Sequence, residues 1–388
     1  MGEGALVFPA AEYRGRVARL QAQMAQAGLD AILLTTPADV FYVTGFLTRF
    51  WESPARPWFV VVPAAGPPVA VIPEIGAALM GRTWIADIRT WPSPDPEDDG
   101  VGLLADALGE LTARTGRIGV PSGPETHVRM PLRDLRRLER AIAPRTLGDA
   151  TAAVHRVREI KSAAEIAKIR ATCAVAARAF DRVPHVARAG RGLDEVVRDF
   201  QVALLQEGAD WVGYVAGAAG PGGYTDVISP AGPTPLAPGD MLMLDTGAVR
   251  EGYFCDFDRN FAIGRASPEM HRTHRALWQA TETALAELRP GMRACDAHGL
   301  LAAALARFGA EPAAGRLGHG LGVSLTEWPS FTPRDRTILR EGMVLALEPG
   351  AVVAPGRLQV HEENVVLRAE GCALLSPRAP ADLPEIGA

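Results

Sequence analysis

Two aspartates lie within a run of residues that otherwise has the character of a buried β-strand. The run is YFCDFDRNF, residues 253–261, in which Asp256 and Asp258 alternate with aromatic side chains. Successive side chains of a strand point to opposite faces, so Asp256, Asp258 and Asn260 would share one face. A buried carboxylate is costly unless a positive group meets it. Any fold of this chain must therefore bring a compensating charge to these aspartates.

A second apolar run, MLMLDTGAV at residues 241–249, precedes this strand, and the polar residues REG at 250–252 separate the two. The pattern predicts a β-hairpin. A turn centred between the first two of these polar residues would place Asp245 directly opposite Asp256. Opposed side chains of an antiparallel pair have Cβ atoms about 5 Å apart, so two carboxylates there would repel each other.

The C-terminal region contains a comparable arrangement. The runs MVLALEPGAVV (343–353) and RLQVHEENVVL (357–367) flank the turn signal PG at 355–356. A hairpin centred on that dipeptide would place Glu348 opposite Glu363, with a bulge or an edge position at the neighbouring proline. In either hairpin, a slip of one residue is the alternative register.

Two opposed pairs of carboxylates in one domain indicate a site for positive ions. A single acidic residue near a turn is usually solvated, and that is the alternative for each pair taken alone. Four carboxylates carry four negative charges, which two divalent cations would balance. Oxygen ligands suit ions such as Mn, Fe, Co or Zn, so we expect two divalent metal ions as cofactors.

A histidine could supply a nitrogen ligand to such a site. His319 lies in GRLGHGLG (315–322), where glycines on both sides allow close approach of backbone and ligands. A hydrogen-bonded histidine in a polar turn is the alternative. His271 and His274 lie on a helix predicted between residues 267 and 289, and we expect both to face solvent.

The length of 388 residues predicts two domains. The expected second domain, residues 155–388, packs helices on antiparallel strands, which makes the chain α+β. The expected first domain, residues 1–154, is mixed α/β, with a helix at 103–114 and strands at 30–35, 58–63, 68–73 and 117–121.

Composition restricts the partners. A formal net charge of −5 argues against a nucleic acid, and no run approaches the roughly 18 apolar residues of a membrane span. The N-terminal residues lack the basic and apolar segments of a signal peptide. We therefore expect a cytoplasmic protein with no nucleic-acid or membrane partner, whose four cysteines are free thiols.

Five residues resemble, in their order along the chain, the metal ligands of the pita-bread metallopeptidases: Asp245, Asp256, His319 in GHGLG, Glu348 in LEPG and Glu363 in HEEN. This family includes methionine aminopeptidase, aminopeptidase P, prolidase and creatinase. Residues 19–46 resemble its creatinase-type N-terminal domain, and residues 158–170 resemble the helix that begins the catalytic domain. The resemblance therefore covers nearly the whole chain.

The resemblance implies a pita-bread catalytic domain at 155–388, preceded by a smaller creatinase-type domain at 1–154. It implies that Asp245 binds one metal ion and His319 the other, while Asp256 and Glu363 contact both. Glu348 would bind metal and relay a proton from the bridging water to the leaving nitrogen, so Glu348 and His319 are the expected catalytic residues.

The activity implied by the resemblance is dinuclear hydrolysis of C–N bonds, of the Xaa-Pro dipeptidase or aminopeptidase type. The substrate would be a short peptide or another small molecule. The metals would be manganese, cobalt, zinc or iron, and the assembly a homodimer.

Several residues depart from the family pattern. Proline-specific members carry histidines where this chain has Gly315 and Thr326, and a third near Ile228. His361 replaces the arginine of the Arg-x-Glu motif of prolidases. The alternatives are therefore a small non-peptide substrate, as for creatinase, ectoine hydrolase or a sulfonium-compound lyase, and a non-catalytic binding scaffold. Thr326 and His361 are candidates for contacts around the metals or with substrate.

Asp258 is a further departure, because prolidases commonly carry threonine at this position. By strand parity Asp258 shares the face of Asp256. It would either hydrogen-bond a metal ligand or form an ion pair with Arg259 or another cation.

Substrate contacts outside the catalytic domain are expected from the loop at 48–58. Creatinase-type N-terminal domains can reach a partner's active site, and Trp51 and Arg56 are the candidate residues here. A surface or interface contact is the alternative for both. Core packing is expected of three further aromatic residues, with pocket lining as the alternative: Tyr224, Trp211 and Trp328.

Overall fold

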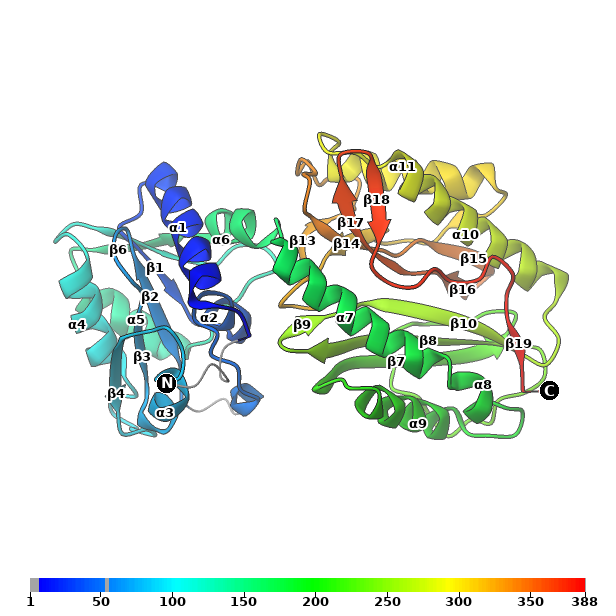
Figure 1. The fold of residues 1–388 in the computed structure, drawn as a ribbon, viewed down its shortest axis with the longest axis horizontal. Coiled ribbons are helices and arrows are strands. Elements are labelled where there is room, and N and C mark those ends of the chain that lie inside the picture. The colour runs from blue at the N-terminus through cyan, green and yellow to red at the C-terminus, as the bar shows by residue number, and fades with distance from the viewer. Residues whose placement is uncertain (1–6, 53–55, 388) are drawn as a thin grey trace. The chain divides into compact units, whose positions relative to one another are not determined.

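The computed structural model describes residues 7–52 and 56–387 of the chain (Figure 1). The chain forms two compact units, residues 1–158 (unit 1) and residues 159–388 (unit 2). The boundary expected from the sequence, between residues 154 and 155, falls within helix α6 (Thr151–Arg158). Unit 2 contains all five residues of the expected metal site.

Unit 1 is built on a mixed sheet with the strand order β4-β3-β2-β1-β5-β6. Antiparallel pairs join β1 to β2 and β2 to β3, whereas the other neighbours pair in parallel. This agrees with the mixed α/β character expected of the N-terminal part. The strands are β1 (Ala31–Leu34), β2 (Phe59–Pro63), β3 (Val69–Pro73), β4 (Asp87–Trp91), β5 (Arg117–Val120) and β6 (Thr146–Asp149).

The first helix of unit 1 shows why these segments pack as they do. Tyr13, Val17, Leu20 and Met24 recur at helical spacing and are all buried, and Gly28 ends the helix in a left-handed conformation with φ 63°. The helices of unit 1 are α1 (Ala10–Ala27), α2 (Pro37–Thr44), η1 (Phe50–Glu52), η2 (Glu74–Gly76), α3 (Ala77–Met80), α4 (Val101–Leu111), α5 (Leu132–Ala141) and α6.

Unit 2 packs helices against antiparallel sheets, as the sequence predicts. Helix α9 lies against β7, whereas α10 lies against β15 and β18, so different helices cover different sheets (Figure 1). The strand orders of the sheets are β19-β10-β8-β7, β13-β12-β14-β17-β18 and β11-β15-β16, with β9 paired to β8.

Serine side chains begin two long helices of unit 2. Ser162 accepts a hydrogen bond from the Glu165 N–H at the start of α7, and Ser267 accepts one from the Met270 N–H at the start of α10. The helices are α7 (Ala163–Phe180), α8 (Val183–Val186), α9 (Leu193–Gln206), α10 (Pro268–Glu287) and α11 (Ala294–Arg307). The strands are β7 (Trp211–Pro221), β8 (Asp240–Arg250), β9 (Tyr253–Phe254), β10 (Phe257–Ile263), β11 (Glu311–Pro312), β12 (Gly318–Gly320), β13 (Glu327–Ser330), β14 (Val344–Leu347), β15 (Gly350–Ala354), β16 (Arg357–Val360), β17 (Glu363–Arg368), β18 (Gly371–Leu374) and β19 (Glu385–Ile386).

The first predicted hairpin exists, but its turn lies one residue later than expected. Glu251 and Gly252 both have positive φ, 51° and 82°, which is the geometry of a tight two-residue hairpin turn. Consequently Asp245 pairs with Asp258 rather than with Asp256. The predicted direct opposition of Asp245 and Asp256 is wrong, because glycine at the second turn position favours this later turn.

The second predicted hairpin also exists, with a change of register beyond its turn. Ala354 pairs with Arg357, as the expected turn requires, but a bulge follows and Val352 pairs with Leu358. In the adjoining ladder Leu347, not Glu348, lies opposite Glu363. The predicted opposition of Glu348 and Glu363 is therefore wrong by one residue. A shift of one residue reverses the face on which each side chain lies.

Candidate metal centre

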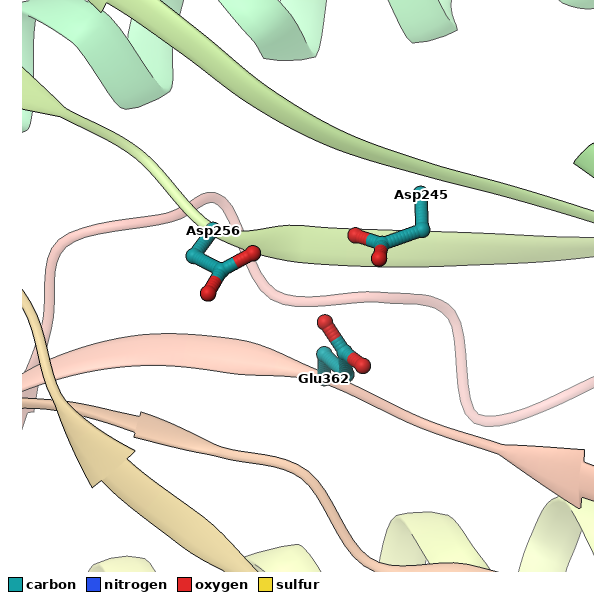
Figure 2. A group of neighbouring side chains, drawn as sticks. All are labelled: Asp245, Asp256 and Glu362. Carbon is teal, nitrogen blue, oxygen red and sulfur yellow. The ribbon is translucent and has the colours of Figure 1, made fainter. Parts of the chain in front are cut away.

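Three carboxylates converge in unit 2. Oxygen atoms of Asp245, Asp256 and Glu362 all lie within 4.8 Å of one another, and Figure 2 shows the three side chains turned toward a common space. Asp245 lies in the middle of β8, Asp256 in the link between β9 and β10, and Glu362 in the link between β16 and β17. These three residues form what we call the carboxylate cluster.

His319 and Glu348 lie beside this cluster. The His319 Nε2 atom is 3.1 Å from Asp256 Oδ2 and 3.6 Å from Glu348 Oε2. His319 Nδ1 lies 2.7 Å from the carbonyl oxygen of Gly320. Because a carbonyl can only accept, Nδ1 carries a proton and donates it to Gly320. Nε2 can then donate a hydrogen bond to Asp256, and once it has lost its proton it offers a lone pair to a cation. We call the cluster together with His319 and Glu348 the candidate metal centre.

Glu363 does not join this centre. Its buried carboxylate accepts hydrogen bonds from Arg378 Nη1 at 3.0 Å, the Ala379 N–H at 2.8 Å and Arg259 Nη2 at 3.2 Å. The Ser376 hydroxyl donates to the same group. The structure therefore does not bring Glu363 together with Asp245 and Asp256. Glu362 lies beside them instead, as the one-residue change in register requires.

His361 lies on the side of Glu363, away from the carboxylate cluster. Its Nε2 is 2.7 Å from Arg378 Nη1, so the neutral ring accepts a hydrogen bond there. Burial and the charge of Arg378 hold the pKa of His361 well below the usual value. His274 stacks edge-on against it, with ring centroids 5.9 Å apart. The expectation that His274 faces solvent is thus wrong.

We expect stability to fall in acid because of these two histidines. Burial also lowers the pKa of His274, whose neighbours His271, Arg275 and Arg378 add positive charge. Both rings are neutral when folded, so at these two histidines the unfolded chain binds more protons than the folded chain below about pH 6.5. The carboxyl groups with raised pKa at the centre act in the opposite direction and are the same in each variant compared below. The free energy of unfolding should then drop by up to about 1.4 kcal/mol per pH unit for each histidine.

Thermal unfolding between pH 5 and pH 8 measures this loss. His274→Gln should flatten the acid side of the profile, because the titrating group is removed. His271→Gln is the matched control, since His271 lies on the same helix but is partly exposed. An unchanged acid slope in His274→Gln would contradict the assignment.

The centre concentrates negative charge in a buried space. Burial, together with the neighbouring carboxylates, raises the pKa of Asp245 and of Glu362 well above the usual values. Burial also raises the pKa of Glu348. Oδ1 of Asp245 is buried without a hydrogen-bond partner among the described residues. Oxygen-rich donors that lack hydrogen-bond partners suit hard or borderline divalent cations, so the residues present fit such ions.

Asp258 contacts two members of the carboxylate cluster through the backbone. It lies opposite Asp245 in the ladder of β8 and β10, and its Oδ1 accepts a hydrogen bond of 2.6 Å from the Glu362 N–H. Oδ2 accepts from Asn260 Nδ2 at 2.5 Å, and burial raises the pKa of Asp258 to about 8. Of the two alternatives for Asp258, the contact with a candidate ligand is the one formed, whereas Arg259 pairs with Glu363.

Replacing Asp258 by asparagine should leave metal binding intact and slow catalysis about tenfold. The amide oxygen of the new asparagine can still accept a hydrogen bond from the Glu362 N–H. Its amide nitrogen, however, would replace the oxygen that now accepts from Asn260 Nδ2, so that hydrogen bond would be lost. Elemental analysis and steady-state kinetics of Asp258→Asn test this expectation. Complete loss of bound metal would instead identify Asp258 as a ligand.

Two residues that contact the candidate metal centre, Asn364 and Arg316, were not predicted from the sequence. The Asn364 side chain accepts a hydrogen bond of 2.8 Å from the Asp256 N–H and donates to the Asp256 carbonyl, which fixes this ligand's backbone. Arg316 Nε donates to Glu348 Oε1 at 2.7 Å, and Nη2 donates to Thr326 Oγ1 at 3.3 Å. Arg316 lies in the same 315–322 motif as His319, and this closeness in sequence was the one feature that could have indicated a place for Arg316 at the site.

The expected substrate contacts of unit 1 stay predictions. The Arg129 guanidinium lies 5.2 Å from the ring centroid of Trp51, and that of Arg56 lies 5.2 Å from the ring of Phe50. Both candidates therefore belong to local aromatic and cationic packing in unit 1.

The other aromatic candidates divide between core and partly buried positions. Tyr224 is fully buried, and its hydroxyl donates to Asn260 Oδ1 at 3.2 Å, so it packs in the core. The Trp328 indole donates to Thr337 Oγ1 at 2.6 Å. Trp211 begins β7 in a half-buried position. Of these, Tyr224 packs in the core as expected.

Comparison with known proteins identifies the chain's relatives. Residues 167–370, more than half of the chain, match the model of metallopeptidase family M24. The chain belongs to this family. Residues 16–160 match the creatinase/prolidase N-terminal domain. The resemblance to pita-bread metallopeptidases is thus confirmed, and with it a metal-dependent hydrolase.

Individual M24 relatives span nearly the whole chain. The probable dipeptidase PepE of Mycobacterium tuberculosis is 29% identical over 384 residues, which cover 98% of each chain. The ectoine hydrolase of Halomonas elongata is 25% identical over 395 residues, with 96% of each chain covered. The crystal structure of dipeptidase PepE from Mycobacterium ulcerans superposes with a TM-score of 0.84 at 29% identity, covering 98% of this chain and 100% of that chain.

These matches confirm the pita-bread fold for this M24 chain. M24 peptidases use divalent metals, and the convergence of Asp245, Asp256 and Glu362 supplies the carboxylates for them. Across the described residues, none of the helices combines the length and apolar character that a membrane crossing requires.

Proposed function

We propose that this M24 chain is a dinuclear metallopeptidase that cleaves dipeptides or short peptides. The observation that carries the proposal is the convergence of the carboxylate cluster with His319 and Glu348. Five residues from separate strands and links supply four negative charges and one imidazole nitrogen, which two divalent cations would balance. The expected ligands are Asp245, Asp256, His319, Glu348 and Glu362.

Bound divalent cations polarise a carbonyl group and lower the pKa of a water molecule. The chain's own residues manage protons and geometry around them. Glu348, 17% exposed and hydrogen-bonded to Arg316, is placed to accept a proton and donate it to the leaving nitrogen. His319 is held by the Gly320 carbonyl with Nε2 directed at the centre. Asp258 and Asn364 hold the backbones of Glu362 and Asp256.

The peptide class rests on the dipeptidase-named relatives, which match at full length. The preference for proline on the leaving side rests only on the family resemblance, since Gly315 and Thr326 replace two histidines of proline-specific members. Manganese, cobalt, zinc or iron as the metal, a homodimer and a cytoplasmic location remain predictions. Size-exclusion chromatography with light scattering would test the dimer.

A second candidate is hydrolysis of a small non-peptide substrate. The observation that favours it is the 25% identity to an ectoine hydrolase across 96% of both chains. A purely binding role is disfavoured, because a buried group of carboxylates gives a scaffold no advantage that would offset its repulsion.

A substrate screen separates these functions. Purified protein loaded in turn with Mn²⁺, Co²⁺, Zn²⁺ or Fe²⁺ is incubated with Xaa-Pro dipeptides, other dipeptides, cyclic amidines such as ectoine, and guanidino compounds. We expect dipeptide hydrolysis that disappears on chelation and returns with metal. Turnover of only a cyclic or guanidino compound would contradict the peptidase and support the second candidate.

A further inference from the structure

Arg316 occupies a distinctive position at the candidate metal centre. It precedes β12, which carries His319, and its guanidinium bridges Glu348 and Thr326. Its side chain is 33% exposed, whereas that of Glu348 is 17% exposed. Arg316 therefore lies at the more open edge of the centre. Among ion pairs between described residues, it is the only arginine or lysine that reaches a carboxylate of the centre.

The other nearby arginines serve a different carboxylate. Arg259 and Arg378 both contact Glu363, on the face turned away from the carboxylate cluster. Their side chains are only 11% and 17% exposed. Neither is placed to meet a molecule that enters from solvent at Glu348, which leaves Arg316 for that role.

The charge balance points to an anionic partner for Arg316. Four carboxylates and two divalent cations cancel, and neutral His319 adds nothing. With cations bound, Glu348 would face both a metal ion and Arg316, 2.7 Å from its Oε1, so the guanidinium adds one positive charge at the edge of the centre. Its two hydrogen bonds use two of the five N–H groups that a guanidinium offers, and the planar fork of the remaining groups matches a carboxylate.

We propose that Arg316 is a specificity-determining residue that binds the free carboxylate of the substrate. This inference rests on the proposed peptidase function. Thr326 acts as a positioning residue, because it fixes the Nη2 end of the guanidinium. A carboxylate held this close to the centre lies only one residue beyond the bond to be cleaved. The substrate class is therefore dipeptides with a free C-terminus, in preference to their amides and to longer peptides.

The test compares a dipeptide with its C-terminal amide. The metal-loaded protein should cleave the acid with a kcat/KM about 10- to 100-fold above that of the amide, mostly through KM. Arg316→Gln should remove this preference, because it weakens hydrolysis of the acid more than that of the amide, whereas losing the contact with Glu348 lowers kcat equally for both substrates. Arg316→Lys should restore part of the preference. Arg272→Gln, an exposed arginine on α10, is the matched control and should change neither substrate.

A binding measurement gives a readout independent of turnover. Calorimetry should show that a free amino acid product such as proline binds the metal-loaded protein more tightly than its amide, and that Arg316→Gln abolishes the difference. Elemental analysis establishes that the variant still holds metal. If Arg316→Gln loses metal, the variant Thr326→Val is tested in its place. This variant should raise KM about 3- to 10-fold for the acid and leave KM for the amide unchanged.

The outcomes separate this inference from the function on which it rests. Dipeptide hydrolysis with equal activity on acid and amide, or a preference retained in Arg316→Gln, overturns the role of Arg316 and leaves the peptidase intact. Equal losses on acid and amide would show that Arg316 serves only to orient Glu348, and also overturn it. If no peptide is cleaved, the calorimetric comparison of amino acid and amide still decides whether Arg316 binds a carboxylate.

Discussion

Glu362→Gln is expected to lose bound metal and at least about 10³-fold in kcat/KM, while the chain still folds. The substitution keeps the size of the side chain but removes one of the charges that would hold the cations, whose electrostatic contribution to catalysis is several kcal/mol. The burial of Glu362 beside Asp245 and Asp256 is the basis of this expectation. Elemental analysis, circular dichroism and peptidase kinetics on the same preparation measure metal, folding and activity together.

The neighbouring glutamate provides the matched control. Glu363→Gln changes the same residue type one position along the chain, but its carboxylate contacts arginines rather than the cluster. We expect Glu363→Gln to retain its metal and to stay within about tenfold of the parent activity. Effects of this size are typical of a residue that contacts the neighbours of a metal ligand rather than the metal itself. Loss of metal in Glu363→Gln with retention in Glu362→Gln would restore the assignment made from the sequence.

The second large effect concerns stability. Glu363→Gln should lower the free energy of unfolding by about 3 kcal/mol, because it leaves Arg259 and Arg378 without their buried counter-charge. Urea unfolding of the metal-free protein measures the change without a contribution from bound ions. Both arginines are less than one fifth exposed, so water compensates them only in part.

Glu282 is the control for this measurement. It pairs with the same Arg378 at 2.8 Å but is 44% exposed. Glu282→Gln should therefore cost about 1 kcal/mol or less, since exposed ion pairs contribute little. Equal effects of the two substitutions would show that burial of Glu363 does not determine its contribution.

The sequence predicted the elements of the site better than their register. The strands around Asp245 and Glu348 and the helix predicted between residues 267 and 289 follow from local patterns that the structure reproduces. The register depended on turn and bulge geometry. Gly252 moved the first turn by one residue, and a bulge near Val352 shifted the second ladder. Such features depend on backbone conformation, which composition and periodicity do not specify.

One shifted ladder was enough to exchange the roles of two adjacent glutamates. In HEEN, residues 361–364, either glutamate matches an acidic ligand by type, and only the face decides between them. Asp256 reached the cluster despite the wrong register, because it lies in a link between strands rather than opposite Asp245. The contact of Arg316 with Glu348 joins residues 32 positions apart, and no local pattern predicts it.

Titration of the metal-free protein with Co²⁺, followed by visible absorption, tests most directly whether the five converging residues form a dinuclear centre. The account predicts that two ions bind per chain, and that Glu362→Gln weakens this binding while Glu363→Gln does not. Failure of the parent protein to bind cobalt, or cobalt binding that is indifferent to Glu362, would contradict it.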